Sequence, residues 1–475
     1  MISTSIVYFI FLVCTLIVFY LSPVKYRNYI LILASLVFYM YVKLSYVIII
    51  LTIIGANYFI GIKIEDSDTK KLKTRYLYLS LLINLGILVY FKYWNSIINN
   101  ISLFPGNSFL KNNFLLGEII LPLGLSYYIF QTIGYILDIY RGSRKSEKNF
   151  SKFSLFILFF PKLLVGPIER AKNLLPQLGK YHLLNKEDLI AGGKLIIWGL
   201  FKKLVVADRI SLYVDAVYSN LPSHNASTFC LATLLYPIQV YADFSGYTDI
   251  AIGSARLFGI NLMENFKQPL FAKNVSDFWR RWHISLSSWV SDYIYTPIVI
   301  KRRDWGSFGV VYALLISFII IGVWHGASWN YVIFGIIQAA ALIYDLETKN
   351  FRKKLSKRIP GYIYNTFSIL LTFLFFAFSL VVFRTTNLSG AVNIIHVMLS
   401  GSGKLFIDHP STMLFIIIGS VILLTSDFIK EYGKTRYNVI HVRGWIFQAL
   451  AYSLLILYII VAGVFDGGQF IYFAF

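Results

Sequence analysis

Charged residues and cysteines are both scarce in this sequence. Charged residues make up 14% of the 475 positions, whereas hydrophobic residues make up 57% and aromatic residues 17%. So apolar a composition is typical of an integral membrane protein. The two cysteines, Cys14 and Cys230, both lie in apolar segments. They support neither a disulfide framework nor a zinc site, and we predict no metal.

Other absences bear on domain organisation. The chain has no linker rich in Gly, Pro or Ser and no low-complexity tail. Its first apolar segment lacks the basic start and the small-residue cleavage site of a signal peptide, so we expect a retained helix. We predict one integral-membrane domain over 1–475, with N-terminal helices in 1–117, a core in about 118–346 and C-terminal helices in 347–475.

Apolar runs long enough to cross a membrane recur along the chain. About 17 to 25 helical residues span a hydrocarbon core of about 30 Å. We therefore expect an all-α protein with about 11 to 13 membrane segments, some of them broken or re-entrant. The candidate segments are 5–22, 28–42, 45–62, 76–91, 118–139, 151–168, 189–206, 228–256, 308–324, 329–346, 364–384, 411–428 and 445–464.

The net charge of +21 is explained by short basic loops between these segments. The basic clusters are 25–27, 63–75, 141–152, 301–303, 349–358 and 430–443, and the loops 93–117 and 385–410 carry little charge. This alternation follows the positive-inside rule and does not indicate nucleic acid as a partner. It predicts a multi-pass protein of the cytoplasmic (inner) membrane, surrounded by lipids, with both termini extracytoplasmic.

Two tryptophan-histidine pairs lie within this apolar sequence. Trp282-His283 is part of the run 277–289, and Trp324-His325 ends a long apolar stretch. Ionisable groups at membrane depth are costly and are candidates for function. Histidine titrates near neutrality, so it can take a proton from a hydroxyl and return it to a leaving group within one turnover. The alternative, a histidine hydrogen-bonded in a helix interface, explains the repeated pairing less well.

Charged residues surround the first histidine, and they are Asp277, Arg280, Arg281 and Asp292. A helix with these charges cannot face lipid cheaply, so it lies at the interface or re-enters the protein beside a wet cavity. We predict that Asp277, Arg280, Arg281, Trp282 and Trp324 bind the substrate, with a cationic entrance for an anionic carrier such as a phosphorylated cofactor. An interfacial anchor of Trp and Arg is the alternative.

The candidate span within 236–260 carries a polar path. Asp243, Tyr247 and Asp249 are predicted to line the substrate, and an internal salt bridge is the alternative interpretation. Asp249 and Arg256 are seven residues apart and share a helix face, so we expect them to pair.

Prolines interrupt an earlier apolar segment, 153–170. Pro161 and Pro167 break its helical ladder, because proline lacks the backbone donor. Broken backbone at membrane depth must be buried in protein or line a wet cavity. We expect this segment to pack against the core and to run into an amphipathic helix, 173–190, on the cytoplasmic surface.

Taken together, these strings resemble the membrane-bound O-acyltransferase family, and in particular its bacterial branch of alginate and peptidoglycan O-acetyltransferases. The matching strings are KYRNYILILASLVFY (25–39), LPLGLSYYIFQTIGYILDIYRG (121–142), FPKLLVGPIER (160–170), YADFSGYTDIAIGSARLFGINLMENFKQPLF (241–271), DFWRRWHISLSSW (277–289) and GVWHGASWNYVIFG (322–335). The resemblance implies a helical core with a tunnel or funnel converging on His325. The family's near-invariant histidine corresponds to His325, and its second polar position corresponds to His283.

The resemblance also implies the chemistry. An acyl group, most often acetyl, would move from a cytoplasmic donor across the membrane toward hydroxyls of an extracytoplasmic polysaccharide. We expect no tightly bound cofactor, and acetyl-coenzyme A is the implied donor. His325 would act as general base or transient acyl acceptor, and His283 would orient or assist. Because the chain has no Gly-x-Ser-x-Gly elbow, an extracytoplasmic partner such as an SGNH-type transferase is implied.

The sequence departs from the alginate branch after its first histidine. That branch continues into an arginine-aspartate pair and an LGGNR-like loop, whereas this chain has SDYIYTPIVIKRRDWG (291–306), with Ser291 in place of the arginine. The teichoic-acid D-alanyl transfer branch also lacks that loop, so this acceptor stays open as an alternative. A transporter or flippase for an acylated or lipid-linked glycan is the rival class, although transport alone explains the paired WH motifs poorly.

Overall fold

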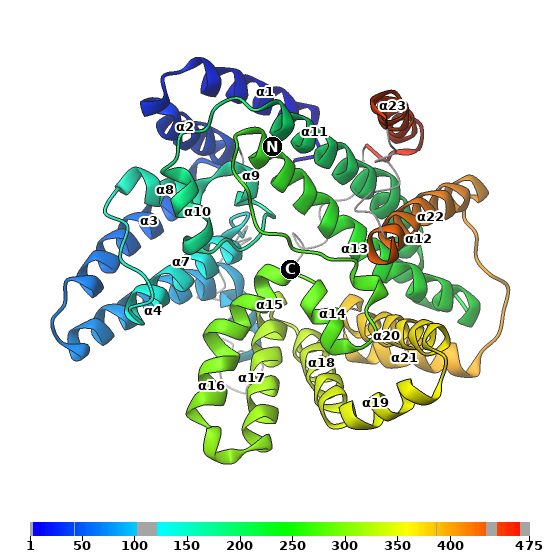
Figure 1. Ribbon diagram of the computed structural model, residues 1–475. Helices are drawn as coiled ribbons and strands as arrows, with labels where there is room; N and C mark the ends of the chain where they lie inside the picture. Colours follow the sequence, from blue (N-terminus) through cyan, green and yellow to red (C-terminus); the bar gives the residue numbers. More distant parts are fainter. Residues whose placement is uncertain (1–2, 42, 102–120, 386, 434–443, 466–475) are drawn as a thin grey trace. The chain divides into compact units, whose positions relative to one another are not determined.

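The computed structural model describes residues 3–41, 43–101, 121–385, 387–433 and 444–465. Over these residues the regular structure is helical, without a strand, which confirms the all-α prediction (Figure 1). The helices are α1 (Ile6–Leu21), α2 (Arg27–Met40), α3 (Leu44–Glu65), α4 (Lys70–Lys92), α5 (Trp94–Ile101), α7 (Leu125–Tyr140), α8 (Phe150–Leu158), α9 (Phe160–Leu163), α10 (Ala171–Leu178), α11 (Lys186–Leu200), α12 (Asp208–Ser219), α13 (Ala226–Leu257), α14 (Val275–Arg281), α15 (Ile284–Val290), α16 (Thr296–Lys301), α17 (Ser307–His325), α18 (Trp329–Glu347), α19 (Lys349–Arg358), α20 (Gly361–Arg384), α21 (Leu388–Ser400), α22 (Pro410–Tyr432) and α23 (Trp445–Ala462). Two π-helical turns, η2 (Phe201–Ala207) and η5 (Ser291–Tyr295), continue α11 and α15.

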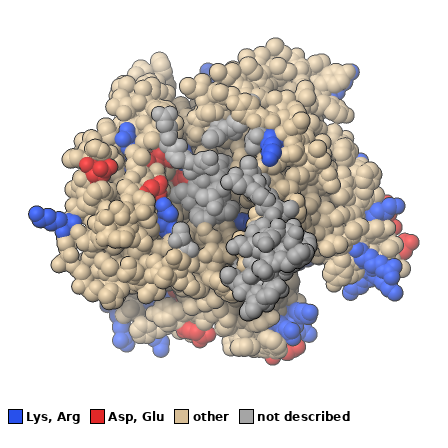
Figure 2. Space-filling model, turned by 180° about the vertical axis from the view of Figure 1, so that it is seen from behind, with Lys and Arg blue, Asp and Glu red and all other residues tan. Residues whose placement is uncertain are grey.

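Seven of the described helices are long and apolar enough to cross a membrane, namely α3, α4, α17, α18, α20, α22 and α23. Helices α1 and α21 are apolar but shorter. On the face shown in Figure 2 most of the described surface is uncharged, as a lipid-facing protein requires. The chain is therefore a multi-pass membrane protein. The total of 11 to 13 segments stays a prediction. The charge-poor loop beyond residue 101 and the basic cluster beyond residue 433 lie outside the described residues.

The helices form two compact units. The first comprises Met1–Leu195 and Ile250–Met263, and the second comprises Ile196–Asp249 and Glu264–Phe475. The division falls within α11 and α13, so two continuous helices pass from one unit to the other. The predicted single functional domain stays a prediction.

A buried polar cluster joins α3 to α4 in the first unit. Asn57 accepts hydrogen bonds at its Oδ1 from the Ser80 hydroxyl, at 2.6 Å, and from Asn84 Nδ2, at 2.9 Å. All three side chains are buried. Small and amide side chains of this kind hold membrane helices together, because in lipid they have no water to bond with.

The proline-containing segment of the first unit is a broken helix. Its helix breaks at Phe159, between α8 and α9. The N–H of Phe160 donates to the Ser35 hydroxyl, in the middle of α2, at 3.1 Å. The carbonyl of Leu178, at the end of α10, accepts from Asn28 at the start of α2, at 2.9 Å. Helix α8 packs on α10, and because of the break 151–168 does not form one continuous helix.

Buried Lys162 satisfies the backbone at this break. Its Nζ donates to Gln131 Oε1 at 2.7 Å and to the carbonyl of Ile157 at 3.2 Å. That carbonyl belongs to the last turn of α8, where helical partners run out. The lysine therefore replaces helical hydrogen bonds that the break removes.

In the second unit α17 and α18 form a hairpin whose backbones touch. A Cβ added at Gly322 would lie 2.3 Å from the carbonyl oxygen of Tyr331. One added at Gly335 would lie 2.2 Å from the carbonyl oxygen of Phe318. Only glycine permits this approach, which is how small residues bring membrane helices together. The hairpin positions the second tryptophan-histidine pair at its tip.

The predicted topology can be tested by cysteine labelling. After Cys14 and Cys230 are replaced by serine, Lys70→Cys and Lys353→Cys should react with a membrane-impermeant maleimide only in permeabilised cells, since basic loops stay in the cytoplasm. Leu405→Cys, in a charge-poor loop, should react in intact cells and serves as the matched control. Labelling of position 70 or 353 in intact cells would reverse the orientation.

Candidate active site

His283 occupies the junction between α14 and α15. Its backbone is left-handed, with φ of 43° and ψ of 52°. This conformation is costly for a residue with a Cβ and recurs at functional sites. The imidazole is buried, with its ring centroid 4.6 Å from that of Phe244 at an interplanar angle of 87°. Burial lowers the pKa of His283 to about 3, so its imidazole is neutral.

His325 is the last residue of α17 and is 5% exposed. Its ring centroid lies 5.1 Å from that of Phe383 and 6.4 Å from that of Tyr331. Gly326 follows it, and a Cβ there would lie 2.5 Å from Cε2 of Tyr331. Glycine is therefore required if Tyr331 is to approach the histidine.

The Trp324 ring lies beside the rings of both histidines. Its ring centroid lies 5.0 Å from that of His325 and 6.0 Å from that of His283. Trp324 is itself buried. Two histidines that are 42 residues apart in sequence therefore pack against one indole in an aromatic environment.

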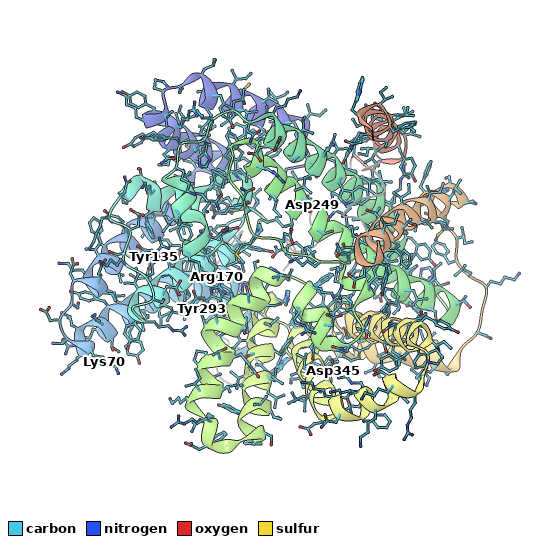
Figure 3. The ribbon with its side chains drawn as sticks, in the orientation of Figure 1. Lys70, Tyr135, Arg170, Asp249, Tyr293 and Asp345 are labelled. Atoms are coloured by element: carbon cyan, nitrogen blue, oxygen red, sulfur yellow. The ribbon has the colours of Figure 1, made fainter. Side chains whose placement is uncertain are left out.

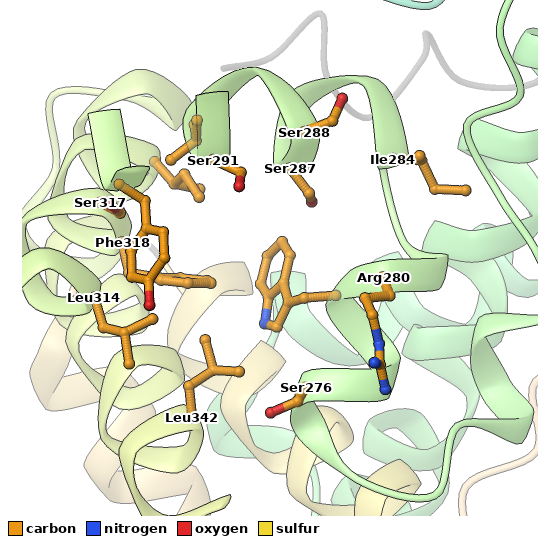
Figure 4. Close-up of a pocket in the computed structure, with 14 residues that line it drawn as sticks. Ser276, Arg280, Ile284, Ser287, Ser288, Ser291, Leu314, Ser317, Phe318 and Leu342 are labelled. Carbon is orange, nitrogen blue, oxygen red and sulfur yellow. The ribbon is translucent and has the colours of Figure 1, made fainter. Parts of the chain in front are cut away.

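A cavity of about 410 Å³ lies beside these helices, with walls from α14, α15, η5, α17 and α18 (Figure 4). Its lining is mostly apolar. The polar residues in the lining include Ser287, Ser288, Ser291, Ser317 and Arg280. Two further lining residues, Ile284 and Ile321, are close to the histidines along the chain, although neither histidine is among the residues that line this cavity. Ile284 directly follows His283, and Ile321 lies about one turn before His325 on α17. The cavity is thus lined by α15 and α17 and is large enough for a small ligand.

The tryptophans around His283 are buried within the protein. Trp279, Trp282 and Trp289 are at most 7% exposed. Arg281 binds both carboxylate oxygens of Glu431 in α22, at 2.7 and 3.0 Å, and its Nε lies 3.0 Å from Asp277. This segment is therefore held by packing and by ion pairs within the protein.

Of the charged residues predicted to bind substrate on α14, Arg280 is the one that faces outward. Its side chain is 74% exposed and lies 3.6 Å from Asp277. Arg281 and Asp277 hold α14 in place instead. Their role in binding stays a prediction.

Asp243 and Tyr247 surround a buried lysine. Lys203 in η2 lies 2.6 Å from Asp243 and 2.7 Å from Asp208, and its ammonium is 5.2 Å from the centre of the Tyr247 ring. Asp243 precedes Phe244, the residue that contacts His283. This ion cluster therefore fixes the part of α13 against which the histidine packs, whereas substrate lining by Asp243 and Tyr247 stays a prediction.

Comparisons with known proteins show the family to which this chain belongs. The sequence profile described as MBOAT, membrane-bound O-acyltransferase family, matches residues 143–386, which include both histidines. The probable alginate O-acetylase AlgI of Pseudomonas syringae pv. tomato is 34% identical over 400 residues, 84% of this chain and 75% of that protein. The chain belongs to the membrane-bound O-acyltransferase family. It is a membrane O-acyltransferase.

Two further relatives carry different names. The peptidoglycan O-acetyltransferase of Helicobacter pylori is 32% identical over 403 residues, 78% of this chain and 74% of that protein. The teichoic acid D-alanyltransferase of Bacillus subtilis is 32% identical over 282 residues, 55% of this chain and 68% of that protein. The names of these three relatives thus refer to alginate, peptidoglycan and teichoic acid.

The predicted pair between Asp249 and Arg256 of this acyltransferase is wrong. Asp249, labelled in Figure 3, binds Lys202 of η2 at 2.6 Å, whereas Arg256 binds Asp188 at 3.1 Å. Seven residues correspond to about 10.5 Å along a helix, whereas side chains of one helix pair at three or four residues. The sequence signal that was missed is the pair of lysines, 202 and 203, inside an apolar stretch.

Other polar residues that the sequence analysis missed tie α14 to the rest of the second unit. Trp279 Nε1 donates to Gln338 Oε1 at 3.2 Å, and Gln338 Nε2 donates to the Ser379 hydroxyl at 2.9 Å. Asp345, labelled in Figure 3, accepts from the N–H of Ser276 at 2.8 Å. Their position inside the apolar candidate span 329–346 was the available signal, because buried polar groups require partners.

The ion pair between Lys202 and Asp249 predicts an effect on protein stability. Asp249→Ala leaves the buried Lys202 ammonium without its carboxylate, which typically costs about 3 to 5 kcal/mol. Detergent-extracted protein should melt at a lower temperature and in lower folded yield. The double variant Lys202→Met/Asp249→Leu should recover both.

The control is Asp304→Ala, which removes an exposed pair with Arg303, 3.8 Å apart. It should change the melting temperature little. A stable but inactive Asp249→Ala protein would instead make Asp249 a binding or catalytic residue.

Proposed function

We propose that this acyltransferase moves an acetyl group from cytoplasmic acetyl-coenzyme A to a hydroxyl on the extracytoplasmic side of the inner membrane, for transfer to a polysaccharide. The observation that carries the proposal is the contact of Trp324 with both His325 and His283. This contact places two groups capable of proton transfer in one buried, aromatic site. The names of the alginate and peptidoglycan relatives support acetyl as the acyl group.

In the proposed reaction His325 is the general base. It takes the proton of the acceptor hydroxyl as the oxygen attacks the thioester carbonyl. The carbon–sulfur bond then breaks, and the thiolate leaves with the proton from His325, so no proton is gained or lost overall. His283 orients the acyl group or assists the transfer. A transient acyl group on His325 is the alternative form of the same step.

The cavity beside α15 and α17 supports a route for the donor. Its apolar walls suit an extended thioester arm, and its serine hydroxyls can bond to amides of that arm. Arg280, exposed at its edge, suits an anionic group. In this proposal the donor enters between α14 and α17 and reaches the histidines along their own helices.

We further propose a separate acceptor protein on the extracytoplasmic side, of the SGNH type, that completes transfer to the polysaccharide. The absence of a Gly-x-Ser-x-Gly elbow from the sequence supports this division of labour. Both termini are proposed to face that side.

Teichoic-acid D-alanyl transfer is the second candidate. The similarity to the teichoic acid D-alanyltransferase of Bacillus subtilis favours it, and so does Ser291 in place of the alginate-type arginine. It would use the same histidines with a different acyl group. Family membership as an O-acyltransferase favours either transfer over a transporter or flippase.

The test compares histidine variants at matched membrane levels. His325→Ala and His325→Gln should fold but lose about 10²- to 10⁴-fold in transfer rate, which is the usual contribution of a general base. His283→Ala should lose less. Acetate and D-alanine released by mild base from the cell-wall and exopolysaccharide fractions measure the product and distinguish the two acyl groups.

His409→Ala is the control, because that histidine is 72% exposed at the side chain and contacts only an exposed aspartate among the described ion pairs. It should release as much acyl product as the wild type. Wild-type release by His325→Ala at equal expression would overturn the catalytic role of His325.

A further inference from the structure

His283 begins α15 without capping it. The first N–H groups of a helix need acceptors, and the side chain of the residue before the helix usually supplies one. The His283 side chain makes no such capping bond. Its ring packs instead against Phe244 and Trp324.

Asn265, 18 residues earlier in the chain, supplies the missing acceptors. Its backbone carbonyl accepts from the N–H of Ile284 at 2.9 Å. Its side-chain Oδ1 accepts from the N–H of Ser285 at 3.1 Å. One residue thus satisfies the first two donors of α15 from outside the helix. Asn265 is 1% exposed, so water cannot take over this task.

The same segment holds the strained backbone of His283 from both sides. The N–H of Lys267 donates to the carbonyl of Arg281 at 2.9 Å, and the N–H of Ile284 donates to Asn265. These two bonds bracket Trp282 and His283. A left-handed non-glycine residue persists only where its surroundings determine it, and here the surrounding bonds come from 265–267.

We propose that Asn265 is a positioning residue for His283: by capping α15 in place of the histidine, it leaves the imidazole directed at Trp324. This inference rests on the proposed role of His283 in the transfer. It also accounts for a buried polar residue in an irregular segment, where neither helical periodicity nor the resemblance pointed to a function. The amide Nδ2 has no hydrogen-bond partner among the described residues, so the acceptor Oδ1 is the atom that matters.

The first experiment separates the acceptor from the rest of the side chain. Asn265→Ala should lower kcat for acyl transfer several-fold at matched folded protein, because the His283 imidazole loses its fixed position, with KM for the donor unchanged. Asn265→Asp keeps Oδ1 and should retain most of the rate. Asn149→Ala, which removes the side-chain cap of α8, is the matched control and should leave kcat unchanged.

The second experiment reads the position of His283 without using activity. Diethyl pyrocarbonate modifies accessible imidazoles, and peptide mass spectrometry reports each site. In the wild type and in Asn265→Asp, His283 should be protected. In Asn265→Ala it should be modified several-fold faster, with His325 unchanged.

The two readouts distinguish failure of this inference from failure of the proposed function. Protection of His283 in Asn265→Ala, an equal gain of reactivity at His325, or an Asn265→Asp protein as slow as Asn265→Ala would each overturn the positioning role. If His283→Ala transferred acyl groups at the wild-type rate while the reactivity shift was still observed, Asn265 would position a histidine that the reaction does not need.

Discussion

The contact of Trp324 with two histidines is the interaction on which the site depends. It requires that α17 end beside α18, which the backbone approach at Gly322 and Gly335 makes possible. It also requires that the chain turn sharply at His283, whose left-handed backbone separates α14 from α15. Either condition alone would place one histidine without the other.

Buried ion pairs hold the frame around this contact. In a membrane protein a charged side chain must find its partner inside the fold, because lipid offers none. Lys203 meets two aspartates at α13 and α12, and Arg281 connects α14 to Glu431 of α22. These ion pairs hold neighbouring helices together, whereas Arg280 lies at the edge of the cavity. Lys203 and Arg281 are thus engaged in ion pairs between helices, whereas the Arg280 side chain is exposed.

The sequence predicted local features well and long-range pairing poorly. Apolar periodicity placed the span 329–346 almost where α18 lies, at Trp329–Glu347. The repeated tryptophan-histidine pairs predicted that the two imidazoles could meet, and both lie beside Trp324. The partner of Asp249 and the cap supplied by Asn265 could not be predicted. Both depend on segments that are distant in sequence, and no local pattern encodes which of them meet. The break between α8 and α9 was predictable from the prolines, whereas its partners in α2 were not.

Substitution of Trp324 tests most directly whether this indole organises the pair. At matched folded protein, Trp324→Ala should transfer acyl groups about as slowly as a variant without one of the histidines, since neither imidazole then has its shared contact. Trp324→Phe, which keeps an aromatic ring, should retain a substantial part of the rate. Trp329→Ala, at a residue that is 72% exposed, is the control. A Trp324→Ala protein with the wild-type rate would contradict the account.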